Sequence, residues 1–447
     1  MSRTHARRVL AVGTAALVSA MAVSLSGSPA AATIADSTQF YVGQPNHDAV
    51  SQIAQLTSQG RQAEAGQIRD IINTPTAVWV EGDSAKAAEQ QVRQITYQAA
   101  GKKTVPVLVL YNIPFRDCAQ YSAGGATSTA EYEAWIDGVV RGIGDRQAVI
   151  ALEPDSLGII PWYTNIDGQL EWCQPADADP ATAASDRFAM LNYAVDALTA
   201  LPNTSLYLDG THSAWLNVGD VSQRLVRAGV LRADGFFLNA SNYQYTANQV
   251  QYGTWISSCI TWVSQLGGTY GGCPNQYWVG GPSNNWGGDW PAGFSSALSP
   301  YGVWSDTATD PAANTAGINE RYASMLNGTT PIVHFIIDTS RNGQGPWDKD
   351  TSDFVMRTPP PTAGQDLQDW CNPPDRGIGI RPTTNTASPL VDAYVWIKVP
   401  GESDGQCSRG YTTLAGVDPA WGIVDPGAGQ WFDQQALELA RLAQPPL

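Results

Sequence analysis

The chain has few of the groups that metal-dependent chemistry needs. Its 447 residues include four histidines and six cysteines, and 25 Lys and Arg stand against 41 Asp and Glu. No Cys-x-x-Cys or His-x-x-x-His spacing occurs, so a structural zinc site is not expected. The formal net charge of −16 gives a surface that repels nucleic acid and anionic lipid. We therefore expect no metal, no cofactor and no nucleic-acid partner, and a ligand that is neutral or cationic.

Long apolar runs are missing except at the N-terminus. There, three arginines precede an apolar stretch from Val9 to Leu25, and Ala30-Ala31-Ala32 offers a cleavage site. Residues 1–32 are therefore predicted to be a secretory signal peptide, and the Arg7-Arg8 pair leaves the twin-arginine route open. No later stretch approaches the ~18 residues of a membrane span. Loss of the leader, with three arginines and no acidic residue, moves the charge from −16 to −19.

Cysteine is scarce but even in number. In the oxidising compartment that a secreted protein enters, six cysteines predict three disulfides. The sequence alone permits many pairings. Cys259 and Cys273, separated by a Gly-rich stretch, are the favoured local pair.

Seven β-branched, apolar runs are present, and they are continuous rather than alternating. This pattern is typical of parallel strands that are covered on both faces. The runs are 76–80, 105–111, 148–152, 205–208, 235–238, 331–337 and 393–399.

Helical patterns lie between several of these runs, which predicts an α/β fold. Ser84 can cap a helix that ends at Gly101, and Thr129 can cap another. Further helices are predicted from about Ala181 to Leu201 and from about Gln430 to Ala443. The Gly-, Trp- and Asn-rich region 250–330 is predicted to be a loop excursion. With no linker or repeat, residues 33–447 are expected to form one domain.

Each predicted strand ends in polar residues. In a barrel of parallel strands, the carboxyl ends meet on one face, and that face holds the active site. Seven runs predict a distorted seven-stranded barrel rather than a regular eight-stranded one. The polar ends are Glu81, Arg116-Asp117, Glu153-Asp155, Asp209-His212, Asn239-Asn242, Asp338-Arg341 and Lys398-Glu402-Asp404.

Carboxylates dominate these ends. No Gly-x-Ser-x-Gly elbow follows a strand, and Asp209 with His212 resembles a metal-ligand pair that stands alone. Paired carboxylates acting as acid and base remain, which are the groups that hydrolyse glycosidic bonds. Sixteen tryptophans and 17 tyrosines support this interpretation, because indole faces can stack on sugar rings. Trp215 and Trp370, in loops after strands, favour binding, whereas Trp396 inside a strand favours core packing.

Several long stretches resemble the signatures of glycoside hydrolase family six, the cellulases. The resemblance runs in order along the mature chain. The stretches are VLYNIPFRDCAQYSAGG (109–125), IALEPDSL (150–157), YLDGTHSAW (207–215), NASNY (239–243), DTSRNGQGPW (338–347), WCN (370–372) and WIKVPGESDG (396–405).

The resemblance implies an inverting hydrolase of β-1,4-glucan, built on a distorted barrel. Asp155 resembles the general acid, and Asp117 resembles the neighbouring carboxylate that raises the acid's pKa and itself stays ionised. Asp404 resembles the residue proposed as base, which inversion would place about 6.5–9.5 Å from the acid. Tyr111 resembles the residue that crowds the sugar at the cleavage point.

The resemblance also implies binding residues and the remaining disulfides. Trp79, Trp370, Lys398 and Glu402 match glycone-side positions, and His212, Trp215 and Asn242 match central and leaving-group-side positions. The implied disulfides are Cys118–Cys173 and Cys371–Cys407, which leave Cys259–Cys273 as the third.

Two positions depart from the family pattern. Ala123, after Ser122, stands where many relatives carry a serine that helps to hold the nucleophilic water. Val218 stands where fungal relatives place a tryptophan, so a distal leaving-side platform is expected to be missing.

Expanded loops bear on the mode of action. About twenty residues, Ser408 to Pro426, are inserted relative to compact bacterial endoglucanases, and 159–180 and 250–330 are also long. Long loops at the strand ends favour a tunnel, and hence an exo-acting monomer that releases cellobiose from non-reducing ends of cellulose and cellooligosaccharides. The alternatives are an endo-β-1,4-glucanase, a non-catalytic glucan-binding protein, and a relative active on xylan or mixed-linkage glucan.

Overall fold

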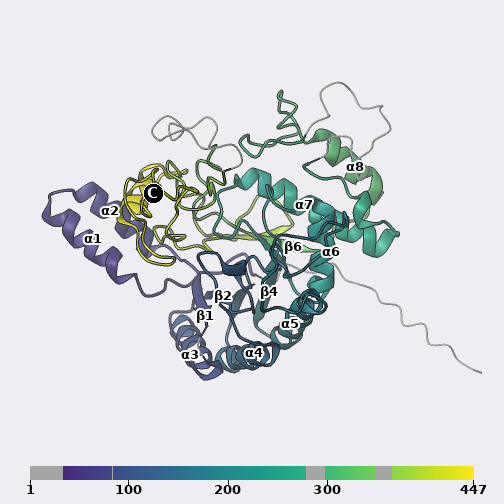
Figure 1. Cartoon of the computed structure of the whole chain (residues 1–447), viewed down its shortest axis with the longest axis horizontal. Helices are drawn as coiled ribbons and strands as arrows, with labels where there is room; N and C mark the ends of the chain where they lie inside the picture. The colour runs from purple at the N-terminus through teal and green to yellow at the C-terminus, as the bar shows by residue number, and fades with distance from the viewer. Residues whose placement is uncertain (1–33, 83, 278–296, 349–364) are drawn as a thin grey trace, which may run out of the picture.

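The computed structural model describes residues 34–82, 84–277, 297–348 and 365–447, and its centre is a curled sheet of seven parallel strands (Figure 1). The strands are hydrogen-bonded in chain order, from β1 to β7. The predicted distorted seven-stranded parallel (β/α) barrel is therefore confirmed. The strands are β1 Val78–Glu81, β2 Val107–Tyr111, β3 Ala148–Leu152, β4 Thr204–Asp209, β5 Gly235–Leu238, β6 His334–Asp338 and β7 Val391–Val395.

The two edges of the sheet nearly meet. Ala77 N donates to Trp396 O at 2.8 Å, and Trp79 Nε1 donates to Ile397 O at 2.9 Å. The chain after β7 thus lies beside β1, although no regular ladder joins them. The predicted strand 393–399 is wrong in its second half, because the N–H groups of Ile397 and Lys398 turn to the buried carboxylate of Asp338.

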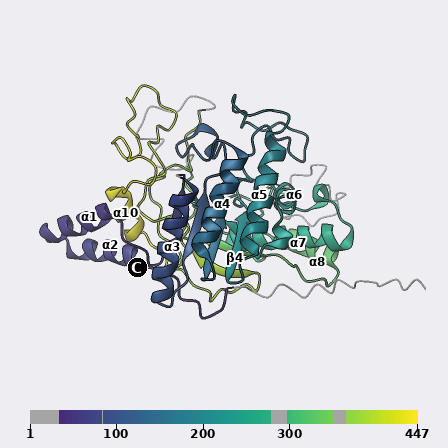
Figure 2. The same cartoon turned by 90° about the horizontal axis from the view of Figure 1, so that it is seen from below.

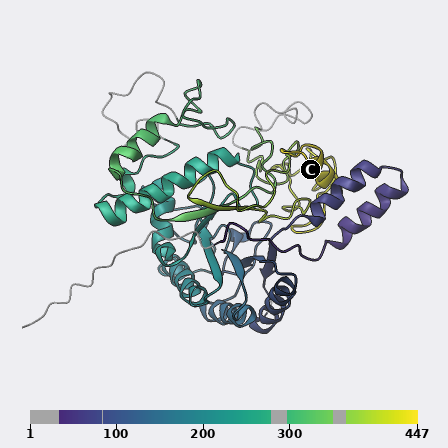
Figure 3. The same cartoon turned by 180° about the vertical axis from the view of Figure 1, so that it is seen from behind.

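An arc of helices covers the outer face of the sheet (Figures 1 and 3). Alternate strand residues, such as Leu108 and Leu110, point outward into the core beneath these helices, and Val109 and Tyr111 point into the barrel. Both faces are therefore apolar, which explains the continuous runs. The helices are α3 Ala85–Gly101, α4 Thr129–Ile143, α5 Ala183–Thr199, α6 Val218–Ala228, α7 Thr246–Leu266 and α8 Ala316–Leu326.

The predicted helix ends shift by a residue or more. Ser84 caps α3 as expected, through its side chain and Ala87 N, but Ser128 rather than Thr129 caps α4. Gly101 is still helical, and the left-handed residue beyond α3 is Lys103. A side-chain oxygen before the first turn decides the cap, and two adjacent hydroxyl residues leave that choice to the tertiary structure.

The prediction of a loop across 250–330 is wrong where α7 and α8 lie, whereas most of the described residues between these two helices, 267–277 and 297–315, are turns and coil. α7 is a 21-residue helix that is buried over much of its circumference. Ser257 and Thr261 are buried with it, and their hydroxyls receive the backbone N–H groups of Val333 and Ile332. A helix buried all round has no amphipathic stripe to recognise. Residues 278–296 lie outside the described ranges.

A second group of helices lies beside the sheet rather than over it (Figure 2). α1 His47–Ser58 and α2 Gln62–Asn73 form a pair that packs with α10 Asp433–Arg441 around Trp396 and Trp431. Trp396 is thus a core residue, as predicted. Short 3₁₀ turns complete the described elements, at Asp117–Ala119, Val230–Arg232 and Tyr270–Gly272.

The six cysteines form three disulfides, Cys118–Cys173, Cys259–Cys273 and Cys371–Cys407. These are the local pair favoured by spacing and the two pairs implied by the resemblance. Among the described residues, no helix has the length and apolarity needed to cross a membrane. The predicted signal peptide, 1–32, lies outside the described ranges.

Candidate active site

A cleft of about 1230 Å³ lies at the carboxyl ends of the strands. All eleven side chains predicted for catalysis or binding line it, from six of the seven strand ends and from the 365–372 segment. They are Trp79, Tyr111, Asp117, Asp155, His212, Trp215, Asn242, Trp370, Lys398, Glu402 and Asp404.

The turn after β3 explains why a buried strand ends in two acids. Glu153 is fully buried, and its carboxylate accepts the backbone N–H groups of Asn112 and Ile113 from the turn after β2. Asp155, two residues later, instead lines the cleft. Glu153 and Asp155 both have positive φ, at 53° and 64°. The first acid therefore joins two turns, and the second lines the cleft.

A buried arginine fixes the same two turns. Arg187, on α5, donates to Ser156 O and Ile159 O on the β3 side, and to Pro114 O on the β2 side, at 2.8–2.9 Å. The turns carry strain, because Asp117 also has a positive φ of 56°. Non-glycine residues in this conformation cost about 1–3 kcal/mol each and persist where surrounding contacts hold them. Arg187 and Glu153 supply such contacts.

Burial and two neighbouring carboxylates favour the protonated form of Asp155. Burial is the largest cause that raises its pKa well above the usual range, followed by the negative charges of Asp209 and Asp117. The sequence-based interpretation gave this effect to Asp117 alone. The structure places burial and Asp209 ahead of it.

Asp117 titrates nearer to neutrality. Burial raises the pKa of Asp117 to about 6, against a lowering by Ser122 N and by Arg116. Ser122 N donates to Asp117 Oδ2 at 2.6 Å, and Arg116 Nε donates to Ser122 O at 3.0 Å. Asp117 is thus ionised above about pH 6.

Asp404 is held as an anion. Both its oxygens lie 2.9 Å from the Arg341 guanidinium, and Lys398 Nζ lies 3.4 Å from Oδ1. Burial acts to raise the pKa of Asp404, but Arg341 and Lys398 outweigh it, so the pKa lies below the usual value. The carboxylate therefore stays ionised at low pH and has a weak affinity for a proton.

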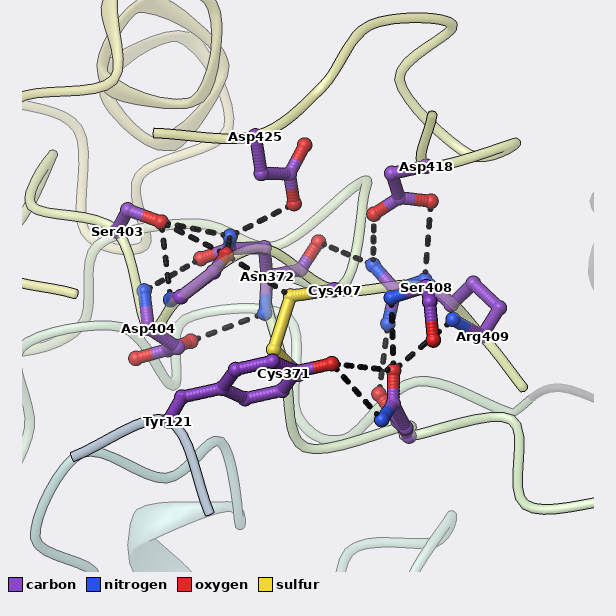
Figure 4. Close-up of a disulfide and its surroundings, with 12 residues drawn as sticks. Tyr121, Cys371, Asn372, Ser403, Asp404, Cys407, Ser408, Arg409, Asp418 and Asp425 are labelled. Atoms are coloured by element: carbon purple, nitrogen blue, oxygen red, sulfur yellow. Dashed lines mark hydrogen bonds and ion pairs between the residues drawn. A yellow bond between two sulfur atoms is a disulfide. The ribbon is translucent and has the colours of Figure 1, made fainter. Parts of the chain in front are cut away.

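Asn372 connects Asp404 to the rest of its wall (Figure 4). Its backbone N donates to Asp404 Oδ2 at 3.0 Å, and its Oδ1 accepts Asp404 N at 2.8 Å. Its Nδ2 reaches Ser403 Oγ and Asp425 Oδ2, at 2.9 and 2.8 Å. The adjacent Cys371–Cys407 disulfide closes the same loop. The predicted base is thus rigidly positioned.

His212 is neutral under ordinary conditions. Burial lowers its pKa to about 3, and Nδ1 accepts Ala214 N at 3.2 Å. The remaining proton then sits on Nε2, as assigned from this hydrogen bond. His212 can therefore donate a hydrogen bond to a sugar oxygen without carrying charge. Its ring lies 5.6 Å from the ring of Trp215.

Several aromatic side chains line the cleft. Trp79 packs edge-on against Tyr111 at 5.4 Å between ring centroids, and Tyr121 lies 6.0 Å from Trp370. These rings are flat apolar surfaces in the same cleft as the carboxylates, which suits the C–H faces of sugars.

The two departures from the family pattern have different surroundings. Ala123 lines the cleft beside Ser122, so a backbone or water contact has to replace a serine hydroxyl there. Val218 is the first residue of α6 and is fully buried in the core. No aromatic platform stands at position 218.

One cluster has the geometry of a metal site but not the chemistry. Within the described part of the chain, ligand atoms of Cys407, Asp418 and Asp425 lie within 4.8 Å of one another. The Cys407 sulfur is bonded to Cys371, and the Asp418 carboxylate is already paired with Arg409 at 2.8 Å. A disulfide sulfur is not a thiolate ligand, so these residues do not fit a resident ion.

Sequence reasoning missed the roles of three residues. Asp209 was grouped with His212 as a metal-type pair, yet its charge acts on Asp155. Arg341 was named only as a strand end, and Asn372 only within a motif. All three lie in stretches that resemble the family signatures, 207–215, 338–347 and 370–372. Their place in these stretches is the signal that could have pointed to them. Their contacts, however, come from segments about 30 to 60 residues apart.

The fold and its row of carboxylates define a glycosidase-type barrel, and comparison with known proteins agrees. Residues 35–443 match the family described as glycosyl hydrolases family 6. The chain belongs to this family.

Individual relatives are moderately similar. The chain is 31% identical to endoglucanase A of Cellulomonas fimi, over 84% of this chain and 56% of that protein. It is 27% identical to a probable 1,4-beta-D-glucan cellobiohydrolase C of Neosartorya fischeri, over 84% of this chain and 71% of that one. The endoglucanase Cel6 of Mycobacterium tuberculosis, solved with a thio-cellobioside, matches with a TM-score of 0.58 and 29% identity over 92% of this chain and 99% of that one. The chain thus spans just over half the length of the first of these relatives.

Proposed function

We propose that the chain is a secreted, inverting hydrolase of β-1,4-glucosidic bonds in cellulose and cellooligosaccharides. The observation that carries this proposal is the convergence of Asp155 and Asp117 in one cleft, where the surroundings of Asp155 favour its protonated form. Burial and two neighbouring carboxylates raise the pKa of Asp155 well above its usual range, burial raises that of Asp117 to about 6, and both side chains line one cleft together with aromatic side chains. A raised pKa next to an ionised neighbour is what a general acid requires.

The remaining residues take roles that follow from their chemistry. Asp155 protonates the leaving oxygen while water attacks the anomeric carbon from the opposite face. Asp404 is the proposed base, and its two cationic partners limit its basicity. Tyr111 crowds the sugar at the cleavage point, and neutral His212 donates a hydrogen bond without adding charge.

Exo-action, with release of cellobiose from non-reducing ends, is the proposed mode. Trp172 of the long 159–180 loop and Tyr301 of the 250–330 region both line the cleft, which extends its walls. The inserted segment from Ser408 to Pro426 does not line it, within the described residues. Endo-action is the second candidate, because two of the relatives above are named endoglucanases.

The test of hydrolysis is Asp155→Ala, assayed on cellohexaose with separation of the product anomers. We expect the variant to retain cellohexaose binding but to lose turnover by roughly four orders of magnitude or more, and the wild type to release α-anomers. Near-wild-type turnover in the variant would remove Asp155 from the mechanism. A rapid fall in viscosity of carboxymethylcellulose, with little soluble sugar, would assign endo-action instead.

A further inference from the structure

An exposed tryptophan that lines the cleft has no counterpart among the binding residues predicted from the sequence. Trp172 lines the cleft, yet its side chain is 55% exposed. Its neighbour Cys173 is bonded to Cys118, which directly follows Asp117. Through the backbone to Cys173 and the disulfide to Cys118, the residue Trp172 is therefore linked to the turn that carries Asp117. This link limits how far Trp172 can move relative to the carboxylates.

The turn that directly precedes the loop of Trp172 packs against Trp215. Gly158 leaves room for the Trp215 ring, because a Cβ at Gly158 would lie 2.4 Å from that ring. Glu171, next to Trp172, forms an ion pair with the buried Arg224 of α6, the helix that begins three residues after Trp215. Since Trp215 is the proposed leaving-group-side platform, Trp172 stands at the leaving-group end of the cleft.

A second exposed aromatic side chain reaches this end from a different segment. Tyr301 lines the cleft and is 38% exposed. Its segment is tied to the stretch around Trp215, because Leu298 N donates to Gln276 O at 2.8 Å. Gln276 Nε2 in turn donates to Ser213 O and Leu216 O, at 3.0 and 2.9 Å.

We propose that Trp172 and Tyr301 form an additional sugar-binding site, which takes glucose units of the leaving-group side beyond Trp215. The occupant is the same glucan chain, because both side chains line the cleft that holds the carboxylates. A large indole left exposed gains free energy when an apolar sugar face covers it. The distal platform that Val218 cannot provide is thus supplied by two loops instead. This inference rests on the proposed function.

The test compares substrates of different length. For Trp172→Ala, the ratio of kcat/KM on cellohexaose to kcat/KM on cellotriose should fall about tenfold, since only the longer substrate reaches the site. Tyr301→Ala should lower the ratio in the same direction. Trp172→Phe should restore most of it. Tyr97→Ala is the matched control, because Tyr97 lies on α3, is 73% exposed and does not line the cleft.

The outcomes separate this inference from the function on which it rests. An unaltered ratio in Trp172→Ala, or an equal loss on both substrates, overturns the additional site and leaves the hydrolase intact. A wild-type enzyme that cleaves no cellooligosaccharide overturns both. Cellohexaose binding in the Asp155→Ala background, measured by calorimetry with and without Trp172→Ala, provides a second readout. A dissociation constant that the second substitution leaves unaltered also overturns the site.

Discussion

The carboxyl of Asp155 keeps its proton for reasons that no single neighbour supplies. Burial acts first, and the charges of Asp209 and Asp117 add to it. Asp209 sits at the end of β4, where its Oδ1 accepts Thr211 N at 2.9 Å. Burial raises the pKa of Asp209 to about 7, so its own charge develops near neutrality. The pH at which Asp155 loses its proton therefore depends on two neighbouring carboxylates, Asp209 after β4 and Asp117 after β2.

Asp209→Asn tests that arrangement. The substitution keeps the acceptor for Thr211 N but removes the charge, so the pKa of Asp155 should fall. We expect the basic limb of the kcat/KM pH profile to move to lower pH by about one unit, and by less in Asp117→Asn. The acidic limb, near pH 6, should persist in Asp209→Asn and vanish in Asp117→Asn. A larger shift of the basic limb in Asp117→Asn than in Asp209→Asn would contradict the stronger effect assigned to Asp209.

At the scale of elements, the inserted segment from Ser408 to Pro426 is anchored behind the wall of Asp404 rather than over the cleft. Arg409 and Asp418, both fully buried, form a two-bonded ion pair at 2.8 and 3.1 Å (Figure 4). Arg409 also donates to Asn372 O at 2.9 Å. Burial, together with the nearby charge of Asp418, raises the pKa of Asp425 to about 8, although Asn372 lowers it. The Ser408 to Pro426 segment is thus anchored by the Arg409–Asp418 ion pair and by Asp425, which accepts a hydrogen bond from Asn372.

Asp425→Asn should change how stability depends on pH. In the native state Asp425 keeps its proton to about pH 8, whereas the unfolded chain loses it near pH 4. The native state binds the extra proton between these values, so stability falls as pH rises from 4 to 8. The variant lacks this loss, so its free energy of unfolding relative to wild type should rise by up to about 5 kcal/mol across that range, at about 1.4 kcal/mol for each pH unit.

The measurement is urea denaturation at pH 4.5, 6 and 8, with the exposed Asp177→Asn as control. A difference between Asp425→Asn and wild type that does not depend on pH would show that Asp425 is already ionised in the native state.

On the scale of the whole molecule, covalent links join segments that the strand order keeps apart. Cys118–Cys173 closes 55 residues and joins the turn of Asp117 to the loop of Trp172. Cys259–Cys273 closes only 14, beside α7. Because a closed loop loses unfolded-state entropy with its length, the longer link should stabilise the fold more.

The double variant Cys118→Ala/Cys173→Ala should lose about 4 kcal/mol of unfolding free energy, and Cys259→Ala/Cys273→Ala about 3 kcal/mol. Only the first should also lower kcat, because it frees the turn that holds Asp117. Thermal unfolding and cellohexaose turnover check both. An equal loss of kcat in the two variants would show that the link does not position the catalytic turn.

Local pattern determined much of the fold. The strands 148–152 and 235–238 were predicted with their observed bounds, because each is a short apolar run between turn residues. The eleven cleft residues followed from strand ends and from motif resemblance. Apolar runs and sequence motifs each consist of residues that are contiguous in the chain, so both can be recognised without the structure.

The tertiary structure decided what no contiguous stretch encodes. α7 was missed because burial on all sides removes helical periodicity, and β7 ends early because Asp338 captures its N–H groups. The charge of Asp209 on Asp155, the anionic state of Asp404 and the platform at Trp172 each depend on segments distant in sequence. Sequence fixes which groups are present, but pKa and exposure depend on what surrounds a group in space, and folding alone sets those surroundings.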